Sequence, residues 1–570
     1  MNKITIIALL YLTLIVGFFF RISGIDWDQG HHMHPDERAI VLSVVDLSFP
    51  TRFSEFFSPE SPWNPQFFAY GSFPFYLLRI AGDVVGTIDP LFAEYDRINI
   101  LGRFLSALFD NGTIIVIYFI GKHLKNRLVG LLSSMIYALS VLPIQLSHFF
   151  AVDTLLTFFL TLTLFVLLKL YEKPSLKNAL FIGISFGLAL DTKISATVII
   201  SSISLAFLLD FLLIFLKSPH RFSIWKPHLT PLFKRIMTYG VIIICTVIMV
   251  FAFFQPYAFI DSERFMKHLQ EQSHMTKDAF TFPYTFQYVG KIPYLYELTN
   301  IFLFGMGPVI GTVSFLGFLY CLYRVVYKTT NFPWQKTLIL LQFFITYFLI
   351  TGSFAIGFMR YMLPLYPLLC LFAGILLYTL LKKYPLRKSK LYAVCYMLFA
   401  ILLLTWPLSF MSIYFTPNTK IQATAWMLQN IPAGKTLATE HWDDTLPLTN
   451  QHLYAMKSLP MYEPDTKEKW KTINEILNET DYIVIASNRL YAPLMKLTDC
   501  TNLPANRCYL RTSIYYKELF EETSGFTKVA EFTSFPTLPL TNITFNDQSA
   551  DESFTVYDHP KIMIFQKTHE

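Results

Sequence analysis

The sequence predicts a polytopic α-helical membrane protein that ends in a smaller soluble domain. Hydrophobic residues make up 53% of the 570 residues and charged residues only 15%, whereas a soluble domain usually carries about a quarter charged residues. Apolar runs of membrane-spanning length recur as far as residue 410 and then stop. Basic residues recur in alternate loops between those runs. The composition therefore excludes a soluble enzyme, and the abundance of apolar residues excludes a disordered chain.

The membrane part, residues 1–410, contains about eleven apolar runs. No small-x-small cleavage site follows the first run, at 4–20, so we expect a retained span rather than a cleaved signal peptide. A span needs about 20 apolar residues, so the run at 178–192 is short and must be helped by its neighbours. The other runs lie near 100–120, 128–147, 152–170, 195–216, 236–254, 299–323, 337–356, 361–381 and 391–410.

The basic loops predict the orientation of these spans. Every even-numbered span is followed by a basic loop, and the opposite short loops contain almost no Lys or Arg. Positive loops stay in the cytoplasm, so we expect a cytoplasmic amino terminus. Counting the ambiguous stretch 68–88 as a span would put all five basic loops outside, so we expect it to be juxtamembrane or re-entrant. The basic residues are Lys122, Lys125, Arg127, Lys169, Lys173, Lys177, Lys217, Arg221, Lys226, Lys234, Arg235, Arg324, Lys328, Lys336, Lys382, Lys383, Arg387, Lys388 and Lys390.

This orientation puts the outer loops 24–98 and 255–298 and the C-terminal domain 411–570 on the extracytoplasmic side. The C-terminal domain has a helical pattern at 421–430 and from Asp465 to Leu477, and strand patterns at 435–439, 482–486 and 561–566. We therefore expect a small mixed α/β domain. Cys500 and Cys508 are the only cysteines outside the apolar part and form the sole plausible disulfide pair, and the sequence leaves open whether they are bonded.

The first candidate site lies in the outer loop 24–98, in the run His31-His32-Met33-His34-Pro35-Asp36-Glu37-Arg38. Proline is favoured at the first helical position and carboxylates at the positive end of the helix dipole, so one interpretation is a well-capped interfacial helix. The alternative is that Asp36 and Glu37 carry chemistry. Three histidines in four residues also suggest a divalent metal, although that spacing is poor for one site on a regular element.

Four further ionisable residues lie at the ends of apolar runs: Arg103, Asp153, Lys193 and Arg360. Each alone has a structural interpretation, as a helix N-cap, a snorkelling anchor or a lone interfacial charge. An ionisable group at the mouth of an apolar helix is nevertheless costly and is a functional candidate. The orientation places all four at the same membrane face as Asp36 and Glu37. Carboxylates beside cations at a lipid surface suit a lipid-phosphate substrate, with the cations on the phosphate and a carboxylate for proton transfer.

These segments resemble the GT-C membrane glycosyltransferases, and within them the protein O-mannosyltransferase and aminoarabinose transferase superfamily. The resemblance spreads over residues 20–370 in the family's order and does not cover the C-terminal domain. It implies an inverting transfer of a sugar, of hexosyl or mannosyl type, from a polyprenyl-phosphate donor to an acceptor hydroxyl outside the cytoplasm. The matching pieces are Asp36-Glu37, Gly102-Arg103-x-x-Ser106-Ala107, Asp153, Gly187-Leu188-Ala189-Leu190-x-Thr192-Lys193 and Arg360-Tyr361-x-Leu363-Pro364-x-Tyr366-Pro367.

The resemblance also implies a role for each matched residue. Asp36 matches the catalytic acid and would be the general base, Glu37 would orient its neighbours, and Arg103 would steady this acidic pair. Asp153 matches a second acidic residue near the sugar or acceptor. Lys193 and Arg360 would bind the donor phosphate and offset charge on the leaving group.

The implied partners are a polyprenyl-phosphate-linked sugar, an acceptor that is a protein, a lipid or a glycan, and membrane lipid, without nucleic acid. The implied location is the plasma (inner) membrane. The chemistry requires no cofactor or metal, and the histidine cluster departs from the family pattern and leaves a divalent metal open. The rival functions are a transporter or flippase of a lipid-linked solute, which should place polar groups near mid-membrane, and a non-catalytic scaffold.

Two further outer segments have open interpretations. The loop 255–298 interleaves aromatic and hydrogen-bonding residues, which suits either a sugar or acceptor platform or a linker that packs under the C-terminal domain. The run Glu440-His441-Trp442-Asp443-Asp444 could contact carbohydrate or a metal, but a turn with a buried tryptophan is the favoured interpretation.

Overall fold

The computed structural model describes residues 2–217, 222–385 and 389–568. Arg221, Arg387 and Lys388, which contributed to the predicted orientation, lie outside these ranges.

Within these ranges, nine helices are long and apolar enough to cross a membrane, and a tenth span results if the bent pair α5 (Arg127–Ala138) and α6 (Val141–Ser147) counts as one. The shorter apolar helix α8 (Leu176–Leu190) matches the remaining expected span. Each of the eleven apolar runs therefore coincides with a helix, although the strict count is nine or ten. The nine are α1 (Lys3–Ile22), α4 (Tyr95–Leu124), α7 (Asp153–Glu172), η3 with α9 (Ile194–Lys217), α10 to α12 (Ser223–Phe254), α16 (Pro308–Val326), α17 (Trp334–Gly352), η8 with α18 (Met359–Lys383) and α19 (Lys390–Met411).

Close packing explains how the short helix α8 is accommodated. A Cβ atom on Gly183 would lie 2.4 Å from Cβ of Thr246, and one on Gly187 would lie 2.7 Å from Cβ of Val250. Both partners belong to α12 (Val241–Phe254), so the two glycines let the helices approach closely. The expected help from neighbouring helices is confirmed, and it holds the end of α8 beside the site described below.

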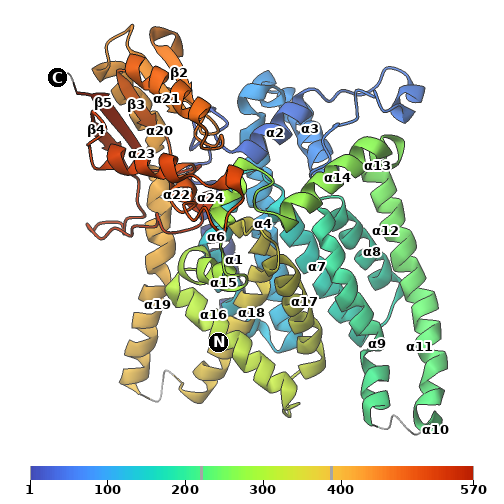
Figure 1. Ribbon diagram of the computed structural model, residues 1–570. Helices are drawn as coiled ribbons and strands as arrows, with labels where there is room; N and C mark the ends of the chain where they lie inside the picture. The colour runs from blue at the N-terminus through green and yellow to red at the C-terminus, as the bar shows by residue number, and fades with distance from the viewer. Residues whose placement is uncertain (1, 218–221, 386–388, 569–570) are drawn as a thin grey trace.

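The elements of the two outer loops gather at one end of the helix bundle, which we call the outer end. Figure 1 shows α2 (Pro35–Val45), α3 (Phe73–Gly86), α13 (Tyr257–Ile260) and α14 (Ser262–Lys277) at the same end as the C-terminal domain. The helix α10 (Phe222–Trp225) lies at the opposite end (Figure 1). The helix α3, in the ambiguous stretch 68–88, is not among the helices long and apolar enough to span. This arrangement agrees with the predicted one, while the side that faces the cytoplasm stays a prediction.

The C-terminal domain contains a five-stranded mixed sheet in the order β2-β1-β3-β5-β4. The strand β1 pairs in parallel with β2 and β3, whereas β5 pairs antiparallel with β3 and β4. The expected mixed α/β domain is confirmed, and β2, β4 and α23 are elements that the sequence patterns did not indicate. The bounds are β1 Thr436–Glu440, β2 Ala455–Leu459, β3 Tyr482–Ile485, β4 Phe526–Phe532, β5 Ile562–Lys567, α20 Thr419–Asn430, α21 Lys467–Glu479 and α23 Leu510–Phe520.

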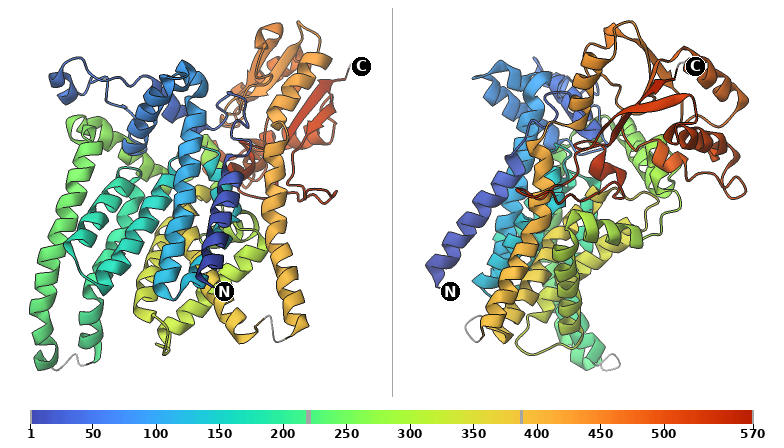
Figure 2. Two further views of the ribbon diagram at one scale, coloured as in Figure 1. Left: turned by 180° about the vertical axis from the view of Figure 1, so that it is seen from behind. Right: turned by 90° about the vertical axis from the view of Figure 1, so that its left-hand side faces the viewer.

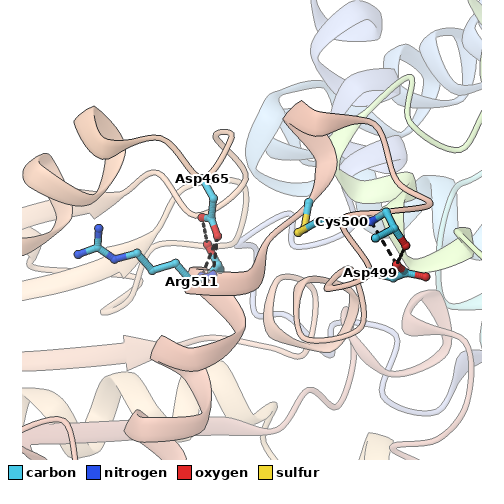
Figure 3. Close-up of a disulfide and its surroundings, with 7 residues drawn as sticks. Asp465, Asp499, Cys500 and Arg511 are labelled. Atoms are coloured by element: carbon cyan, nitrogen blue, oxygen red, sulfur yellow. Dashed lines mark hydrogen bonds between the residues drawn. A yellow bond between two sulfur atoms is a disulfide. The ribbon is translucent and has the colours of Figure 1, made fainter.

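Cys500 and Cys508 are joined by a disulfide, so the expected pair is confirmed. Figure 3 shows the bridge beside Asp499 and, on the neighbouring chain segment, Asp465. The Asp465 carboxylate accepts hydrogen bonds from the backbone N–H groups of Arg511 and Thr512, which lie in the first turn of α23. The loop closed by the disulfide thus leads directly into a capped helix of the domain.

The C-terminal domain lies against the outer end of the bundle (Figure 2). A buried polar cluster joins the two. The His559 imidazole contacts Asp558 and lies 2.9 Å from Asp547. Burial would lower the pKa of His559, but the two carboxylates raise it to about 10, so the ring keeps its proton at neutral pH. Asp558 in turn accepts hydrogen bonds from Gln145 of α6 at 3.0 Å and from Tyr414 at 2.8 Å. The domain is therefore held in a defined position over the spans.

Candidate active site at the outer end

The amino terminus of α2 forms one wall of the site. His34 is the N-cap, Pro35 is the first helical residue, and Asp36 and Glu37 lie in the first turn, so the expected helix start is confirmed. The His34 ring lies between Phe149 and Tyr557, and burial lowers its pKa to about 3. The ring is therefore neutral at physiological pH, and Nδ1 can accept the hydrogen bond that the Glu37 backbone N–H donates over 3.3 Å.

Four of the six predicted residues meet in one cluster of alternating charge. Arg360 Nη2 lies 2.9 Å from Asp36 Oδ2, and Arg360 Nε lies 3.7 Å from Asp153 Oδ2. Lys193 Nζ donates a hydrogen bond to Asp153 Oδ1 over 2.9 Å. These residues come from α2, α7, the start of η3 and the start of η8, so packing of four segments is needed to assemble them.

Asp36 is the accessible carboxylate of the cluster. Its side chain is 26% exposed, whereas that of Asp153 is 1% exposed. Burial would raise the pKa of Asp36, but the positive charges of Arg360 and Lys193 lower it, and the net pKa lies below the ordinary value. Asp36 is therefore ionised at neutral pH and can accept a proton from a group that approaches from outside.

Two polar atoms of the cluster have no hydrogen-bond partner although they are buried: Asp153 Oδ2 and Arg360 Nε. Buried polar groups are normally hydrogen-bonded, and each unsatisfied one calls for an explanation. One of these atoms is an acceptor and the other a donor, and both face the gap of 3.7 Å between the two side chains. The arrangement leaves hydrogen-bonding capacity in the site for groups that are not part of the chain.

A cavity of about 610 Å³ adjoins the cluster through Lys193. The Lys193 ammonium lies over the ring of Tyr361, 4.5 Å from its centroid, and 5.7 Å from that of Tyr70. Both tyrosines also line the cavity. The membrane helices contribute apolar residues to its wall, among them Val198, Phe251 and Ile350. The outer segments contribute both apolar residues, such as Phe265 and Leu269, and the polar residues Gln255, Gln272 and Ser273.

Glu37 and Arg103 form a separate buried unit with Asp28. The Arg103 guanidinium donates two hydrogen bonds to each carboxylate, at 2.5–2.9 Å, and one to the Ile25 carbonyl at 2.9 Å. All three side chains are fully buried. Glu37 also accepts a hydrogen bond from the Phe150 backbone N–H, three residues before Asp153. This unit connects α2 with α4 and with the chain that leads into α7. The resemblance implied that Arg103 steadies the pair Asp36 and Glu37. In the structure, Arg103 instead pairs with Glu37 and Asp28.

Residues of the C-terminal domain form the outer rim of the site. Tyr557 contacts His34, and the Arg489 guanidinium lies 5.8 Å from the Tyr557 ring centroid. Trp442 is 45% exposed, so the expectation of a buried tryptophan is wrong. Its backbone φ of 82° holds it in the left-handed region, and its ring lies 6.5 Å from that of Tyr284. Burial raises the pKa of Tyr284, and the nearby Asp36 carboxylate raises it further.

The loop 255–298 packs under the C-terminal domain, as one of its two interpretations predicted, whereas its use as a sugar or acceptor platform stays a prediction. Its first part lines the cavity with Gln255 and Gln272. Its second part packs under the C-terminal domain, where Phe286 belongs to the hydrophobic core of that domain. Gln287 and Glu552 exchange hydrogen bonds at 2.8 and 3.2 Å. The loop thus connects the cavity with the rim.

The three histidines do not converge on a metal site. His34 caps α2, and the His32 ring packs on Tyr95 at 4.0 Å with both nitrogens unpaired. In the described ranges of the chain, no group of three or more His, Cys, Asp and Glu side chains is arranged to hold a metal ion. The three histidines of the run therefore do not come together in the divalent site that their number suggested.

The site contains residues that the sequence reasoning did not single out: Asp28, Tyr70, Arg489 and Tyr557. Asp28 lies in the same outer loop as Asp36 and carries a carboxylate, which was the available signal. Tyr70, Arg489 and Tyr557 carried no local signal, because they reach the site only through packing of distant segments.

Comparison with known proteins agrees with this architecture. Residues 99–251 match the family model described as dolichyl-phosphate-mannose-protein mannosyltransferase. No curated protein matches. The solved archaeal oligosaccharyltransferase AglB from Archaeoglobus fulgidus, in complex with an inhibitory peptide and a dolichol-phosphate, is 14% identical and has a TM-score of 0.52. That match covers 99% of this chain and 88% of AglB. The chain has the GT-C glycosyltransferase fold.

Two more solved structures are similar to this GT-C chain. The apo form of the Archaeoglobus fulgidus oligosaccharyltransferase is 13% identical with a TM-score of 0.52, covering 99% of this chain and 89% of that one. ArnT from Cupriavidus metallidurans bound to undecaprenyl phosphate is 11% identical with a TM-score of 0.49, covering 87% of this chain and 95% of that one. The segment matched by the family model contains Arg103, Asp153 and Lys193, whereas Asp36 and Arg360 lie outside it.

Proposed function

We propose that this GT-C chain transfers a sugar from a polyprenyl-phosphate-linked donor to an acceptor hydroxyl at the outer end of the bundle. The observation that carries the proposal is the cluster of Asp36, Arg360, Asp153 and Lys193, with its accessible carboxylate, beside a cavity whose wall is apolar at the membrane. The family model for residues 99–251 and the dolichol-phosphate in the AglB complex support a polyprenyl phosphate as the donor lipid.

The cations and the carboxylates of the cluster would have different roles in the reaction. Lys193 and Arg360 would hold the donor phosphate, while the apolar wall of the cavity would take the first prenyl units. The acceptor oxygen attacks the anomeric carbon from the face opposite the phosphate, a C–O bond forms, and the bond to the phosphate oxygen breaks. The electron pair leaves with the phosphate, whose negative charge the two cations stabilise. Attack from the opposite face inverts the anomeric configuration.

Asp36 would act as the general base. It is ionised and partly exposed, and it lies at the rim from which an acceptor must enter. It takes the proton of the acceptor hydroxyl as the new bond forms. Arg360 touches both Asp36 and the gap beside Asp153, so donor binding and the base are coupled through one guanidinium. Asp153, which keeps Lys193 in place, would lie near the sugar.

Glu37 and Arg103 would act as positioning residues. Their side chains are fully buried and hydrogen-bonded to each other, so they have no free face toward a substrate. By holding the first turn of α2 against α4 and the chain before α7, they set the direction of Asp36. The proposed setting is a multi-pass protein of the plasma (inner) membrane with the site outside the cytoplasm, acting on a protein, lipid or glycan hydroxyl, with a hexosyl or mannosyl-type sugar.

The placement of the charges argues against a transporter of a lipid-linked solute. Transport sites lie near mid-membrane, often at broken helices. Here Asp153 begins α7 and Arg360 lies at the start of η8, so the cluster sits at helix ends. A second ion pair, Arg21 with Asp110, lies further along α4, and both of its side chains are fully buried and paired with each other.

The test uses purified protein in nanodiscs with a panel of radiolabelled polyprenyl-phosphate sugars and crude membrane acceptors, and it follows loss of the lipid-linked label. Asp36→Asn should lower the rate by at least about 100-fold, the lower end of what a general base contributes. Asp46→Asn, a matched control at the exposed C-terminal end of the same helix, should leave the rate unchanged. Retained transfer by Asp36→Asn would overturn the assignment of the base. No loss of label from any donor would favour the transporter or the scaffold.

A further inference from the structure

The C-terminal domain sends an uncharged loop back along the bundle to the flank formed by α1 and α19. This segment, residues 533–545, which we call the outer hairpin, lies beside the outer half of α19 in Figure 1 and in the left view of Figure 2. Thr537 and Thr544 form an isolated antiparallel bridge in it. The sequence from Phe532 to Asn546 contains no Asp, Glu, Lys or Arg. The cavity next to Lys193 is lined by Leu190 of α8 and Phe251 of α12, and these two helices lie on the other flank of the bundle from α19 (Figure 1).

The base of the hairpin is fixed to the outer end of α19. The Thr537 backbone N–H donates to the Ser409 carbonyl over 3.1 Å, and Ser409 lies inside the span α19. The Phe545 ring packs edge-on against Trp406 at 5.8 Å. Trp406 precedes the end of α19 at Met411 by five residues, or about 8 Å along the helix axis at 1.5 Å per residue. Tryptophan is enriched where spans cross the membrane–water interface, so the hairpin descends to that interface.

The tip of the hairpin presents apolar side chains outward. Leu540 is fully exposed and Ile543 is 53% exposed. The turn that carries the tip holds Leu540 at a φ of 62°, a left-handed conformation that is uncommon for leucine. Within the hairpin, Leu538 N–H donates to the Ile543 carbonyl over 2.9 Å, which keeps the turn formed. Water is a poor environment for this tip, whereas an acyl layer would cover it.

A groove of about 710 Å³ lies between the hairpin and the outer ends of α1 and α19. Its floor contains Phe19, Leu408 and Phe415, and hydroxyl groups of the hairpin such as Thr541 and Thr544 line its upper part. The apolar floor continues the outward surface of the two spans, where Ile15 is 67% and Leu402 is 53% exposed. Because lipid must cover that surface, the groove is an extension of the lipid-facing wall.

We propose that the outer hairpin and the outer ends of α1 and α19 form a phospholipid-binding site that anchors the C-terminal domain to the membrane leaflet at the outer end. An acyl chain lies on the aromatic floor, Leu540 and Ile543 insert among neighbouring chains, and the hydroxyl groups of the hairpin hydrogen-bond to the headgroup region. The absence of charged residues between 532 and 546 means that the site takes phospholipids without selecting an anionic headgroup. The proposal depends on the membrane fold and is independent of the proposed transfer reaction.

The test places an environment-sensitive NBD fluorophore at position 540 of the full chain in phosphatidylcholine nanodiscs. The exposed Cys245 and Cys395 are first replaced by serine, and Leu540→Cys is labelled. A matched control carries the label at Leu510→Cys, which is 53% exposed on α23 of the same domain. Emission is quenched either by spin-labelled lipid in the disc or by aqueous iodide.

We expect the probe at 540 to emit at shorter wavelength than the probe at 510, to be quenched more strongly by spin-labelled lipid, and to be shielded from iodide. The same result should follow with added anionic phosphatidylglycerol, because the site carries no charge. Equal iodide quenching at the two positions would overturn the proposal. A second outcome would also overturn the proposal. The probe at 540 could be shielded from iodide without being quenched by spin-labelled lipid, and only when two chains share a disc. That result would assign the hairpin to a contact between copies of the chain.

Discussion

Replacing Arg103 tests whether the unit of Arg103, Glu37 and Asp28 builds the site or takes part in the reaction. Arg103→Met removes the five hydrogen bonds of the guanidinium and leaves two carboxylates fully buried without a cation. Removing one partner of a buried ion pair costs about 3–5 kcal/mol, because the remaining charge is uncompensated. We therefore expect the free energy of unfolding to fall by this amount.

A matched control on the same helix separates this effect from the loss of any arginine. Arg97 also lies in α4, but its ion pair with Asp89 is exposed, at 47% and 37% for the two side chains. Exposed pairs contribute about 0–1 kcal/mol, so Arg97→Met should change stability little. The triple variant Asp28→Asn, Glu37→Gln, Arg103→Met also removes the two carboxylate charges that Arg103→Met leaves unpaired. It should therefore recover part of the lost stability. Such coupling between neighbouring sites typically amounts to about 0.5–3 kcal/mol.

The assay is equilibrium unfolding of the purified proteins in mixed micelles with increasing SDS, followed by tryptophan fluorescence. Sugar transfer is measured on the same preparations at a temperature where each variant is folded. A loss of stability by Arg103→Met no larger than that of Arg97→Met would refute the reasoning. Full stability together with abolished transfer would instead mean that Arg103 touches the substrate.

Two further predictions concern pH. Arg360→Gln removes the largest charge that lowers the pKa of Asp36, so the acid limb of the pH profile of kcat/KM should move to higher pH. Arg360→Lys keeps a positive charge beside Asp36 and should leave the acid limb in place. A lower rate of Arg360→Gln with an unmoved acid limb would contradict the pairing of Arg360 with Asp36. In the C-terminal domain, burial raises the pKa of Glu440 from 4.5 to about 8 although Tyr516 donates a hydrogen bond to it. The folded state therefore holds a proton that the unfolded chain releases, and stability should fall as the pH rises from 4.5 to 8. Thermal unfolding should show no such decline in stability between pH 4.5 and 8 for Glu440→Gln. The exposed control Glu475→Gln should show the same decline as the unchanged protein. An equal decline in both variants would count against a protonated Glu440.

Local patterns were enough to predict most of the elements. The run of apolar residues defines each span, because a helix in lipid must satisfy its own backbone and present apolar side chains. Alternation and capping signals located α20, β1, β3 and β5 in the C-terminal domain. The strands β2 and β4 were not predicted, because their residues are largely polar or half-exposed. These segments are strands because they pair with a neighbouring strand of the sheet, and not because of a local pattern.

The alternation of basic loops also predicts that the ionisable residues lie at one end of the bundle. This was predictable because lipid excludes charges from the middle of the spans and the basic loops distinguish the two ends. The side of the membrane on which the outer end lies stays a prediction.

The sequence by itself determined the membrane class, the spans, the C-terminal domain and the gathering of carboxylates and cations at one end. Only the tertiary structure decided which charges pair. Asp36 and Glu37 are adjacent in the chain, yet one contacts Arg360 and the other Arg103, because successive residues on a helix point about 100° apart. Arg360 reaches Asp36 across 324 positions of sequence, and η8 is held in place by its packing against α7. Such pairings depend on the shapes of distant surfaces, and no local run of residues records them.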